Sequence, residues 1–261
     1  MWNLLITCLC VCLFAIEEAR AGDPSPINLK RKLVSVDIDM PDWAKALNLF
    51  ESRLGFPFLL ELNTLTYRSA SMYHGKTEAE AATLSKLFKV HLKNVTVEEA
   101  IKFILKDQAG YNYEVIDGVV LHVYPNGIQN RTNYPLNTVV SNFAIEQKDI
   151  SKDWYMKEFG ALVDPMRIDL GNTYGYVFGT CLSPRVFHNV TLREILIALA
   201  KTCRTQWVFE PLPPDELRLR VAEWGDDFYP QGKRIEARGG DWYQLQCLNP
   251  KEDTVVDGVL R

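Results

Sequence analysis

The stretch Asn94-Val95-Thr96-Val97-Glu98-Glu99 recurs, with two positions changed, as Asn189-Val190-Thr191-Leu192-Arg193-Glu194. In each copy a threonine stands three residues before a glutamate: Thr96 before Glu99, and Thr191 before Glu194. This is the capping-box pattern, in which the hydroxyl and the carboxylate satisfy free N–H groups at the start of a helix. The sequence therefore predicts that a helix begins at the same point in both copies.

Apolar residues follow each predicted cap at the spacing i, i+3, i+4, i+7 and i+8, which is typical of a helix with one apolar face. We expect both helices to bury this face against a sheet. The predicted core stripes are Val97, Ala100, Ile101, Ile104 and Leu105 in the first copy, and Leu192, Ile195, Leu196, Leu199 and Ala200 in the second.

Strand-like segments flank both helices. Residues 90–92 precede the first helix, and residues 111–115 and 119–124 follow it, with Asp117-Gly118 between them as a hairpin turn signal. In the second copy the preceding segment is 186–188. The following segments are 207–209 and 217–221, separated by a proline-rich turn. Each copy is therefore predicted to form a β-α-β unit.

A weaker unit of the same type lies upstream. Residues 33–38 alternate as a strand, and an apolar stripe at helical spacing runs from Trp43 to Leu54. Gly55 suits a helix end, and residues 56–60 are predicted to return as a strand. The predicted fold class is α+β, with tandem small βαβ-type modules whose short mixed sheets pack against one-faced helices. The predicted domains are 31–125 and 135–224.

The chain begins with features of a signal peptide. Residues 4–16 are an apolar run, too short for an ordinary membrane span, and Ala19-Arg20-Ala21 matches a small-x-small cleavage site. We therefore expect residues 1–21 to be removed and the mature protein to be periplasmic or secreted. The composition of residues 225–261, with glycine, aspartate and proline, predicts a loosely structured C-terminal tail.

Composition limits the possible partners. The net charge of the 261 residues is −4, which favours neither a nucleic acid nor an anionic membrane surface as a ligand. We expect any contact with a membrane to be indirect, through a partner protein. Three sequons begin at Asn94, Asn130 and Asn189. Two of them coincide with the helix caps, and the capping role explains these two without glycosylation.

Three cysteines remain after the predicted cleavage: Cys181, Cys203 and Cys247. Because a β-α unit returns the end of its helix toward the start of its strand, a disulfide between Cys181 and Cys203 is geometrically reasonable. Alternatively, Cys203 is a small core residue of the helical stripe. The sequence has no Cys-x-x-Cys motif and no histidine pair at ligand spacing, so no zinc site is predicted.

The sequence predicts no catalytic motif, and it indicates no cofactor. Of the histidines, His91, His122 and His188 fall in predicted strands, and His74 stands apart. No nucleophile elbow, phosphate-binding glycine loop or metalloprotease motif is present. The Gly/Tyr-rich segment 171–179 is either an ordinary insertion or a ligand loop. A secreted enzyme or small-ligand binder would use this loop together with His188, Asp169 or Arg185.

Residues 33–124 resemble the secretin and TonB N-terminus short domain. The resemblance is carried by Val34-Ser35-Val36-Asp37-Ile38, by Leu54-Gly55-Phe56, by Leu92 to Ile101 and by the hairpin from Tyr111 to Tyr124. Residues 135–224 resemble a second copy that has diverged, with Asn189 to Leu196 as its clearest match. In the first half of this copy, from Phe143 to Asp164, most of the apolar stripe is lost.

In that family such modules are periplasmic docking and assembly domains of secretin pores, or signalling domains of TonB-linked receptors, and they are not enzymes. Up to Arg261 we expect neither a pore-forming β-barrel nor a transducing membrane helix. The resemblance therefore implies the docking role alone, with an envelope protein as the partner. Two other hypotheses stay open: the secreted enzyme or ligand binder, and a eukaryotic secreted glycoprotein.

Overall fold

The computed structural model describes residues 26–40, 42–63, 87–145, 155–170, 185–203, 205–211, 243–248 and 259–260. It confirms the predicted α+β class: small mixed and antiparallel sheets with helices packed against their strands. The predicted signal peptide, residues 1–21, lies outside the described residues.

Among its described residues, the first module has the element order β-α-β-β-α-β-β. Its second helix begins behind Thr96, as the capping-box pattern indicates, and its first begins behind Asp42, whose carboxylate accepts the Lys45 N–H at 2.8 Å. Gly55 ends that first helix at a φ of 69°, in the left-handed region that favours glycine. The elements are β1 (Lys32–Met40), α2 (Trp43–Leu54), β2 (Phe58–Glu61), β3 (Phe88–Thr96), α5 (Val97–Leu105), β4 (Tyr111–Ile116) and β5 (Val120–Pro125).

The second module repeats this order with a shorter first helix. In place of α2 it has a π-helical turn, a single α-helical turn and a 3-10 turn, which agrees with the loss of the apolar stripe in this part of the sequence. The connection between the modules carries η2 (Ile128–Asn130) and η3 (Pro135–Asn137). The elements are β6 (Val139–Ile145), η4 (Tyr155–Phe159), α7 (Gly160–Val163), η5 (Asp164–Met166), β7 (Ile168–Leu170), β8 (Arg185–Thr191), α8 (Leu192–Cys203), β9 (Gln206–Pro211) and β10 (Tyr243–Leu248).

One six-stranded sheet joins the two modules, in the order β4-β5-β2-β9-β10-β7. Each half has the same design: an antiparallel pair of strands followed by a parallel strand. These are β4-β5-β2 in the first module and β9-β10-β7 in the second. The halves meet where β2 pairs parallel with β9, from Phe58 opposite Gln206 to Glu61 opposite Phe209. The two predicted domains therefore share a continuous sheet.

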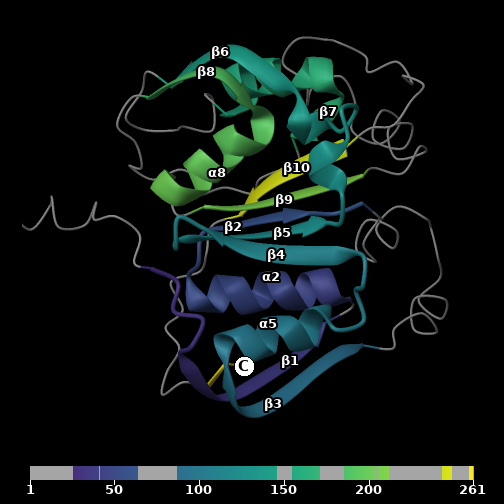
Figure 1. The fold of residues 1–261 in the computed structure, drawn as a ribbon, viewed down its shortest axis with the longest axis vertical. Helices are drawn as coiled ribbons and strands as arrows, with labels where there is room; N and C mark the ends of the chain where they lie inside the picture. Colours follow the sequence, from purple (N-terminus) through teal and green to yellow (C-terminus); the bar gives the residue numbers. More distant parts are fainter. Residues whose placement is uncertain are drawn as a thin grey trace, which may run out of the picture.

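The helices of the two modules cover opposite faces of this sheet. On β2, Phe58 and Leu60 pack with α2 and α5, whereas Leu59 packs with α8, as the alternation of side chains along a strand requires. Outside the helices lie two smaller sheets, β11-β1-β3 and β6-β8. In Figure 1 the layers follow one another from β1 and β3 at the bottom, through the central sheet, to β6 and β8 at the top.

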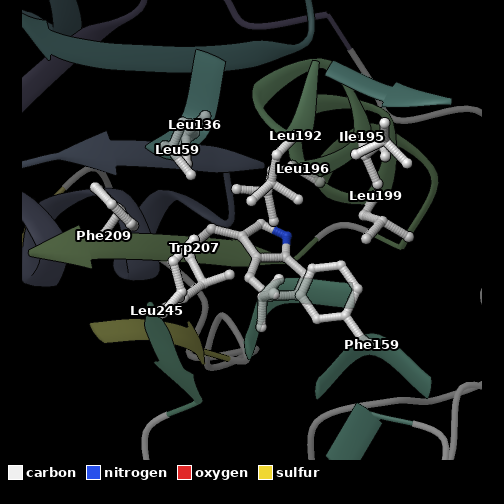
Figure 2. Packing of buried hydrophobic residues seen from close by; sticks show 14 of the residues in the cluster. Leu59, Leu136, Phe159, Leu192, Ile195, Leu196, Leu199, Trp207, Phe209 and Leu245 are labelled. Carbon is white, nitrogen blue, oxygen red and sulfur yellow. The ribbon is translucent and has the colours of Figure 1, made fainter. Parts of the chain in front are cut away.

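Both predicted helical stripes are confirmed, because every residue named in them is buried. The core of the second module centres on Trp207 of β9, whose ring centroid lies 5.8 Å from that of Phe159. Figure 2 shows these two rings beside the leucines of α8, with Leu59 of the first module in the same cluster. The packing of each module therefore extends across the shared sheet.

The outer strand pairs follow the same pattern in both modules. The register of β1–β3 passes from Leu33 to Ser35 and leaves out the position between them. The register of β6–β8 does the same between Val140 and Asn142. The residues opposite the skipped positions are Asn94 and Asn189, which have φ angles of 53° and 50°. Asparagine is one of the few residues that adopt this left-handed conformation at low cost. The repeated asparagine is thus explained by backbone geometry.

The prediction of a loosely structured tail is wrong for two segments of residues 225–261. Residues 243–248 form β10, which lies between β9 and β7 in the central sheet. Residues 259–260 form β11 (Val259–Leu260), which pairs parallel with β1. These strands are defined by pairing with distant segments, and composition alone does not reveal such pairing. The predicted strand 217–221 lies outside the described residues, and β10 takes the place beside β9.

Candidate functional site

A cluster of charged side chains lies buried where the two modules meet. Glu61 ends β2 and His122 lies in β5, both in the first module, whereas Arg193 stands in the first turn of α8. All three are buried. Since His122 lies opposite Leu59 in the parallel register, it shares a sheet face with Leu59 and Glu61, the face on which α8 packs. The cluster therefore draws on both modules.

The guanidinium of Arg193 and the carboxylate of Glu61 form a two-pronged contact. Nε of Arg193 donates to Oε1 of Glu61 at 2.5 Å, and Nη2 donates to Oε2 at 2.9 Å. The remaining nitrogen, Nη1, donates to the side-chain oxygen of Asn137 in η3. The guanidinium carbon also lies 5.7 Å from the ring centroid of Tyr134. Such paired charge-assisted bonds fix orientation as well as adding energy.

The ring of His122 bridges two carboxylates. Its Nε2 lies 2.7 Å from Oε1 of Glu61, and its Nδ1 lies 3.0 Å from Oε1 of Glu114 on the neighbouring strand β4. A carboxylate only accepts hydrogen bonds, so both contacts are hydrogen bonds when both ring nitrogens carry hydrogen. The ring also packs against Tyr124, with centroids 4.6 Å apart.

Burial and pairing act in opposite directions on the pKa of Glu61 and on that of Arg193. Burial alone would raise the pKa of Glu61, but the hydrogen bonds and charges of Arg193 and His122 outweigh it and hold this pKa below its usual value. Burial would lower the pKa of Arg193, yet the bond to Glu61 raises it. Burial raises the pKa of Tyr134 far above its usual value. The ion pair is therefore stable in its charged form.

The arrangement suits a structural lock better than a catalytic centre. Both oxygens of Glu61, both ring nitrogens of His122 and three nitrogens of Arg193 are used within the cluster. A general base or a nucleophile needs a lone pair that is turned toward a substrate. Here the lone pairs face other members of the cluster. The hydrogen bonds of the cluster fix the position of α8 on the sheet of the first module.

The internal repeat shows that this lock belongs to the second copy alone. Glu98 occupies in α5 the position that Arg193 occupies in α8. The side chain of Glu98 is 38% exposed, and its Oε1 accepts a hydrogen bond from Lys102 at 2.6 Å within the same helix. One of the two substitutions in the repeated hexapeptide thus turns a solvent-facing charge into a contact between modules.

The four predicted cap residues lie at the starts of the two helices. In the first copy the Thr96 hydroxyl accepts the Glu99 N–H at 3.2 Å, and the Glu99 carboxylate accepts the Thr96 N–H at 2.7 Å. In the second copy the same bonds join Thr191 and Glu194 at 3.2 and 2.7 Å. The bond from the Thr96 backbone holds the pKa of Glu99 below its usual value. These residues shape the helices and take no part in the buried cluster.

The other polar residues singled out in the sequence are dispersed. His91 is exposed on β3 between Asp37 and Asp39, at 3.3 and 3.1 Å. His188 lies on β8, where its Nδ1 is 2.5 Å from the side-chain oxygen of Asn142, whereas Asp169 lies on β7 in the central sheet. These groups belong to different sheets. The Gly/Tyr segment 171–179 and His74 lie outside the described residues.

The predicted disulfide remains a prediction. Cys181 lies outside the described residues, and Cys203 ends α8 without a described side chain. Cys247 lies in β10, also without a described side chain. Among the described residues no group of three or more histidine, cysteine or acidic side chains is placed to hold a metal ion.

Two features of the sequence point to the buried cluster, although neither belongs to a recognised motif. Glu61 follows the apolar run from Phe58 to Leu60, where a charge is unexpected in a buried strand. Its partner Arg193 is 132 residues away. The change from Glu98 to Arg193 between the two copies was the second signal, and only the shared sheet shows that the two belong together.

Searches for similar proteins identified no matching family model, no curated relative and no solved structure of similar fold. Within the described part of the chain, no helix is both long and apolar enough to cross a membrane.

Proposed function

We propose that this chain is an exported, periplasmic docking or assembly component without enzymatic activity, whose two joined modules hold an envelope protein. One observation carries the proposal: the modules form a single unit in which several strands stand at the ends of their sheets. Among the described residues, strands β3, β4, β6, β7 and β8 each have a neighbour on one side only. An open edge presents backbone N–H and C=O groups that pair readily with another chain.

The buried cluster supports the same reading. Its charged groups join the modules, and the hydrogen bonds within the cluster occupy them. A rigid connection between modules keeps their edges in a fixed relationship, which reduces the ordering cost when a partner contacts both. The resemblance to the secretin and TonB N-terminus short domain points in the same direction, because those modules dock other envelope proteins. The alternative, a secreted enzyme or ligand binder, rests on residues 171–179.

Photo-crosslinking in the source cells tests this function. A photoreactive residue is placed at Asn112 on the β4 edge or at Ser141 on the β6 edge. The control position is Lys106, which directly follows α5 in the sequence, is exposed and does not lie on a sheet edge. We expect an adduct of defined mass in the envelope fraction from at least one edge position and none from Lys106. Equal adducts from all three positions, or a chain that stays in the cytoplasm, would contradict the proposal.

A further inference from the structure

One strand in the outer sheet of the first module comes from a distant part of the sequence. Strand β11 pairs parallel with β1, with Val259 opposite Ser35 and Leu260 opposite Val36 (Figure 1). Because β1 and β11 are so far apart in the sequence, β11 reaches β1 as a segment of another protein would, as an extended strand added to the side of a sheet. The position beside β1 is therefore suited to holding an added parallel strand.

Strand β1 is held in place by contacts other than those with β11. Its opposite side pairs with β3 along its whole length, from Lys32 to Met40. Three of its side chains are buried in the core with α2 and α5: Leu33, Val36 and Ile38. Strand β11, by contrast, has two residues. The receiving strand is therefore ordered by the rest of the module, so a different strand can replace β11 without reordering β1.

The side chains of β1 alternate between the core and solvent, and this alternation sets which residues an added strand needs. Val36 and Ile38 are buried with α2 and α5, whereas Asp37 and Asp39 lie on the opposite face, with side chains 46% and 44% exposed. In a parallel pair, residues that lie opposite each other point to the same face. An added strand therefore needs apolar residues opposite Val36 and Ile38, and cationic residues complement the two aspartates.

The two aspartates flank His91 on the outer face of this sheet. Nδ1 of His91 lies 3.3 Å from Oδ1 of Asp37, and Nε2 lies 3.1 Å from Oδ1 of Asp39. Because His91 belongs to β3, it approaches β1 from the side opposite β11. A carboxylate can accept several hydrogen bonds, so a lysine or arginine on an added strand can contact each aspartate as well. The sequence Val259-Leu260-Arg261 has this order, with a cation directly after the aliphatic pair.

We infer that β11 is a displaceable strand, and that an extended segment of a partner protein takes its place as a parallel strand on β1; this rests on the proposed docking function. The partner segment alternates aliphatic and basic residues. The aliphatic residues lie opposite Val36 and Ile38, and the basic residues lie opposite Asp37 and Asp39. Backbone hydrogen bonds hold the strand and the alternation fixes its register. Strand β11 competes for the same edge and so lowers the apparent affinity for the partner.

A synthetic peptide with this pattern, Ser-Val-Leu-Arg-Val-Lys-Thr, tests the inference on the natural chain. In the register of β11 its leucine lies opposite Val36, and its arginine and lysine lie opposite Asp37 and Asp39. Fluorescence anisotropy of the labelled peptide measures its affinity, and amide hydrogen exchange locates it. We expect saturable binding, faster exchange in residues 259–260 and unchanged exchange in residues 111–116 of β4. The same peptide with glutamate at its two basic positions should bind at least about tenfold more weakly.

Variants of the chain separate the competing strand from the receiving edge. Leu260→Asp places a charge opposite the buried Val36 and weakens β11, so it should bind the peptide at least about threefold more tightly. Asp37→Lys/Asp39→Lys should bind it at least about tenfold more weakly. Asp107→Lys reverses an exposed acid two residues after α5 and should change nothing. A thermal melt shows whether each variant folds, and Asp37→Asn/Asp39→Asn gives the answer if the lysine variant does not.

Three results would overturn the inference. The first is no saturable binding to the natural chain or to Leu260→Asp. The second is binding that leaves exchange in residues 259–260 unchanged, which would place the peptide on another part of the molecule. The third is a dimer in sedimentation experiments that Leu260→Asp abolishes and that excludes the peptide, because β1 would then hold the β11 strand of a second copy.

The docking function is judged separately, by crosslinking in cells from Asn112 and Ser141, neither of which lies on β1. Adducts at these positions without peptide binding to β1 would reject this edge and leave the docking function standing. Peptide binding to β1 without adducts in cells would support the edge as a strand-binding site and contradict the docking function.

Discussion

The guanidinium of Arg193 crosses the junction between the modules and donates two hydrogen bonds to the carboxylate of Glu61, at 2.5 and 2.9 Å. Both side chains are buried. Moving two charges out of water is costly, and their attraction compensates only when the geometry is good and the remaining polar atoms are satisfied. Here Asn137 and His122 complete the bonding, so the pair can fix the position of α8 on the sheet of the first module.

Removing one partner of this pair should destabilise the whole unit. We expect Arg193→Ala to lower the free energy of unfolding by about 3–5 kcal/mol, because it leaves the carboxylate of Glu61 buried without its main counter-charge. The apolar double variant Arg193→Met/Glu61→Met should recover most of this loss. Urea denaturation measures both. Lys102→Ala, which breaks the exposed pair with Glu98, is the control and should change little. A double variant as unstable as the single one would show that the lock is not an ion-pair effect.

The same pair predicts a dependence of stability on acid. The folded pKa of Glu61 lies below its unfolded value, since the bonds to Arg193 and His122 outweigh burial. Its contribution is therefore fully present above the unfolded pKa, about 4.3, and is lost as the pH falls through the folded pKa. Urea denaturation from neutral pH down to acid pH should show this loss in the natural chain. The free energy of unfolding should depend less steeply on pH in Arg193→Met/Glu61→Met. Equal slopes would assign the acid sensitivity to other carboxylates.

Local patterns were enough to predict the helices. The caps at Thr96 and Thr191 depend on residues three positions apart, and the apolar stripes depend on helical spacing, so both were readable from the sequence. The three-residue strand β7 and the two-residue strand β11 were not, because they are strands only through pairing with distant segments. Composition failed for β10 for the same reason.

The candidate cluster was less predictable than the fold. Glu61 and Arg193 are far apart in the sequence, and each could have been an ordinary surface charge. Their contact depends on the parallel pairing of β2 with β9, which brings the first turn of α8 over the end of β2. His122 was correctly placed in a strand, but the alternation of β5 alone did not distinguish a buried from an exposed face.

The helix caps and the helix cores should differ clearly in their effect on stability. We expect Ile104→Ala and Leu196→Ala each to cost about 2–5 kcal/mol, because both side chains are fully buried. Thr96→Ala removes one cap bond and should cost about 1 kcal/mol. Thermal and urea unfolding measure all three. If the core changes are no more severe than the cap change, the assignment of these stripes to the core is wrong.

The repeated asparagines should tolerate glycine but not a β-branched residue. Asn94 and Asn189 have φ angles of 53° and 50°, where a side chain branched at Cβ is strained. We expect Asn94→Gly to be nearly neutral and Asn94→Val to cost about 1–3 kcal/mol, with the same order at Asn189. Unfolding of the four variants tests this. Because Asn94→Gly also removes the sequon, a large effect of glycine alone would indicate that the asparagine side chain has a role beyond backbone conformation.

The carboxyl group of Glu51 should make stability fall as the pH rises. Glu51 lies on the buried face of α2, and neither of its oxygens has a hydrogen-bond partner within the described part of the chain. Burial therefore raises the pKa of this group well above its usual value. The stability that protonated Glu51 contributes is fully present below the unfolded pKa, about 4.3, and is lost as the pH rises through the folded pKa.

The variant Glu51→Gln tests this prediction, because it keeps the shape of the side chain but does not titrate. We expect it to gain stability relative to the natural chain between mildly acidic and alkaline pH, measured by urea denaturation at each pH. A constant difference between the two proteins over that range would mean that Glu51 is ionised in the folded state and has a partner of its own.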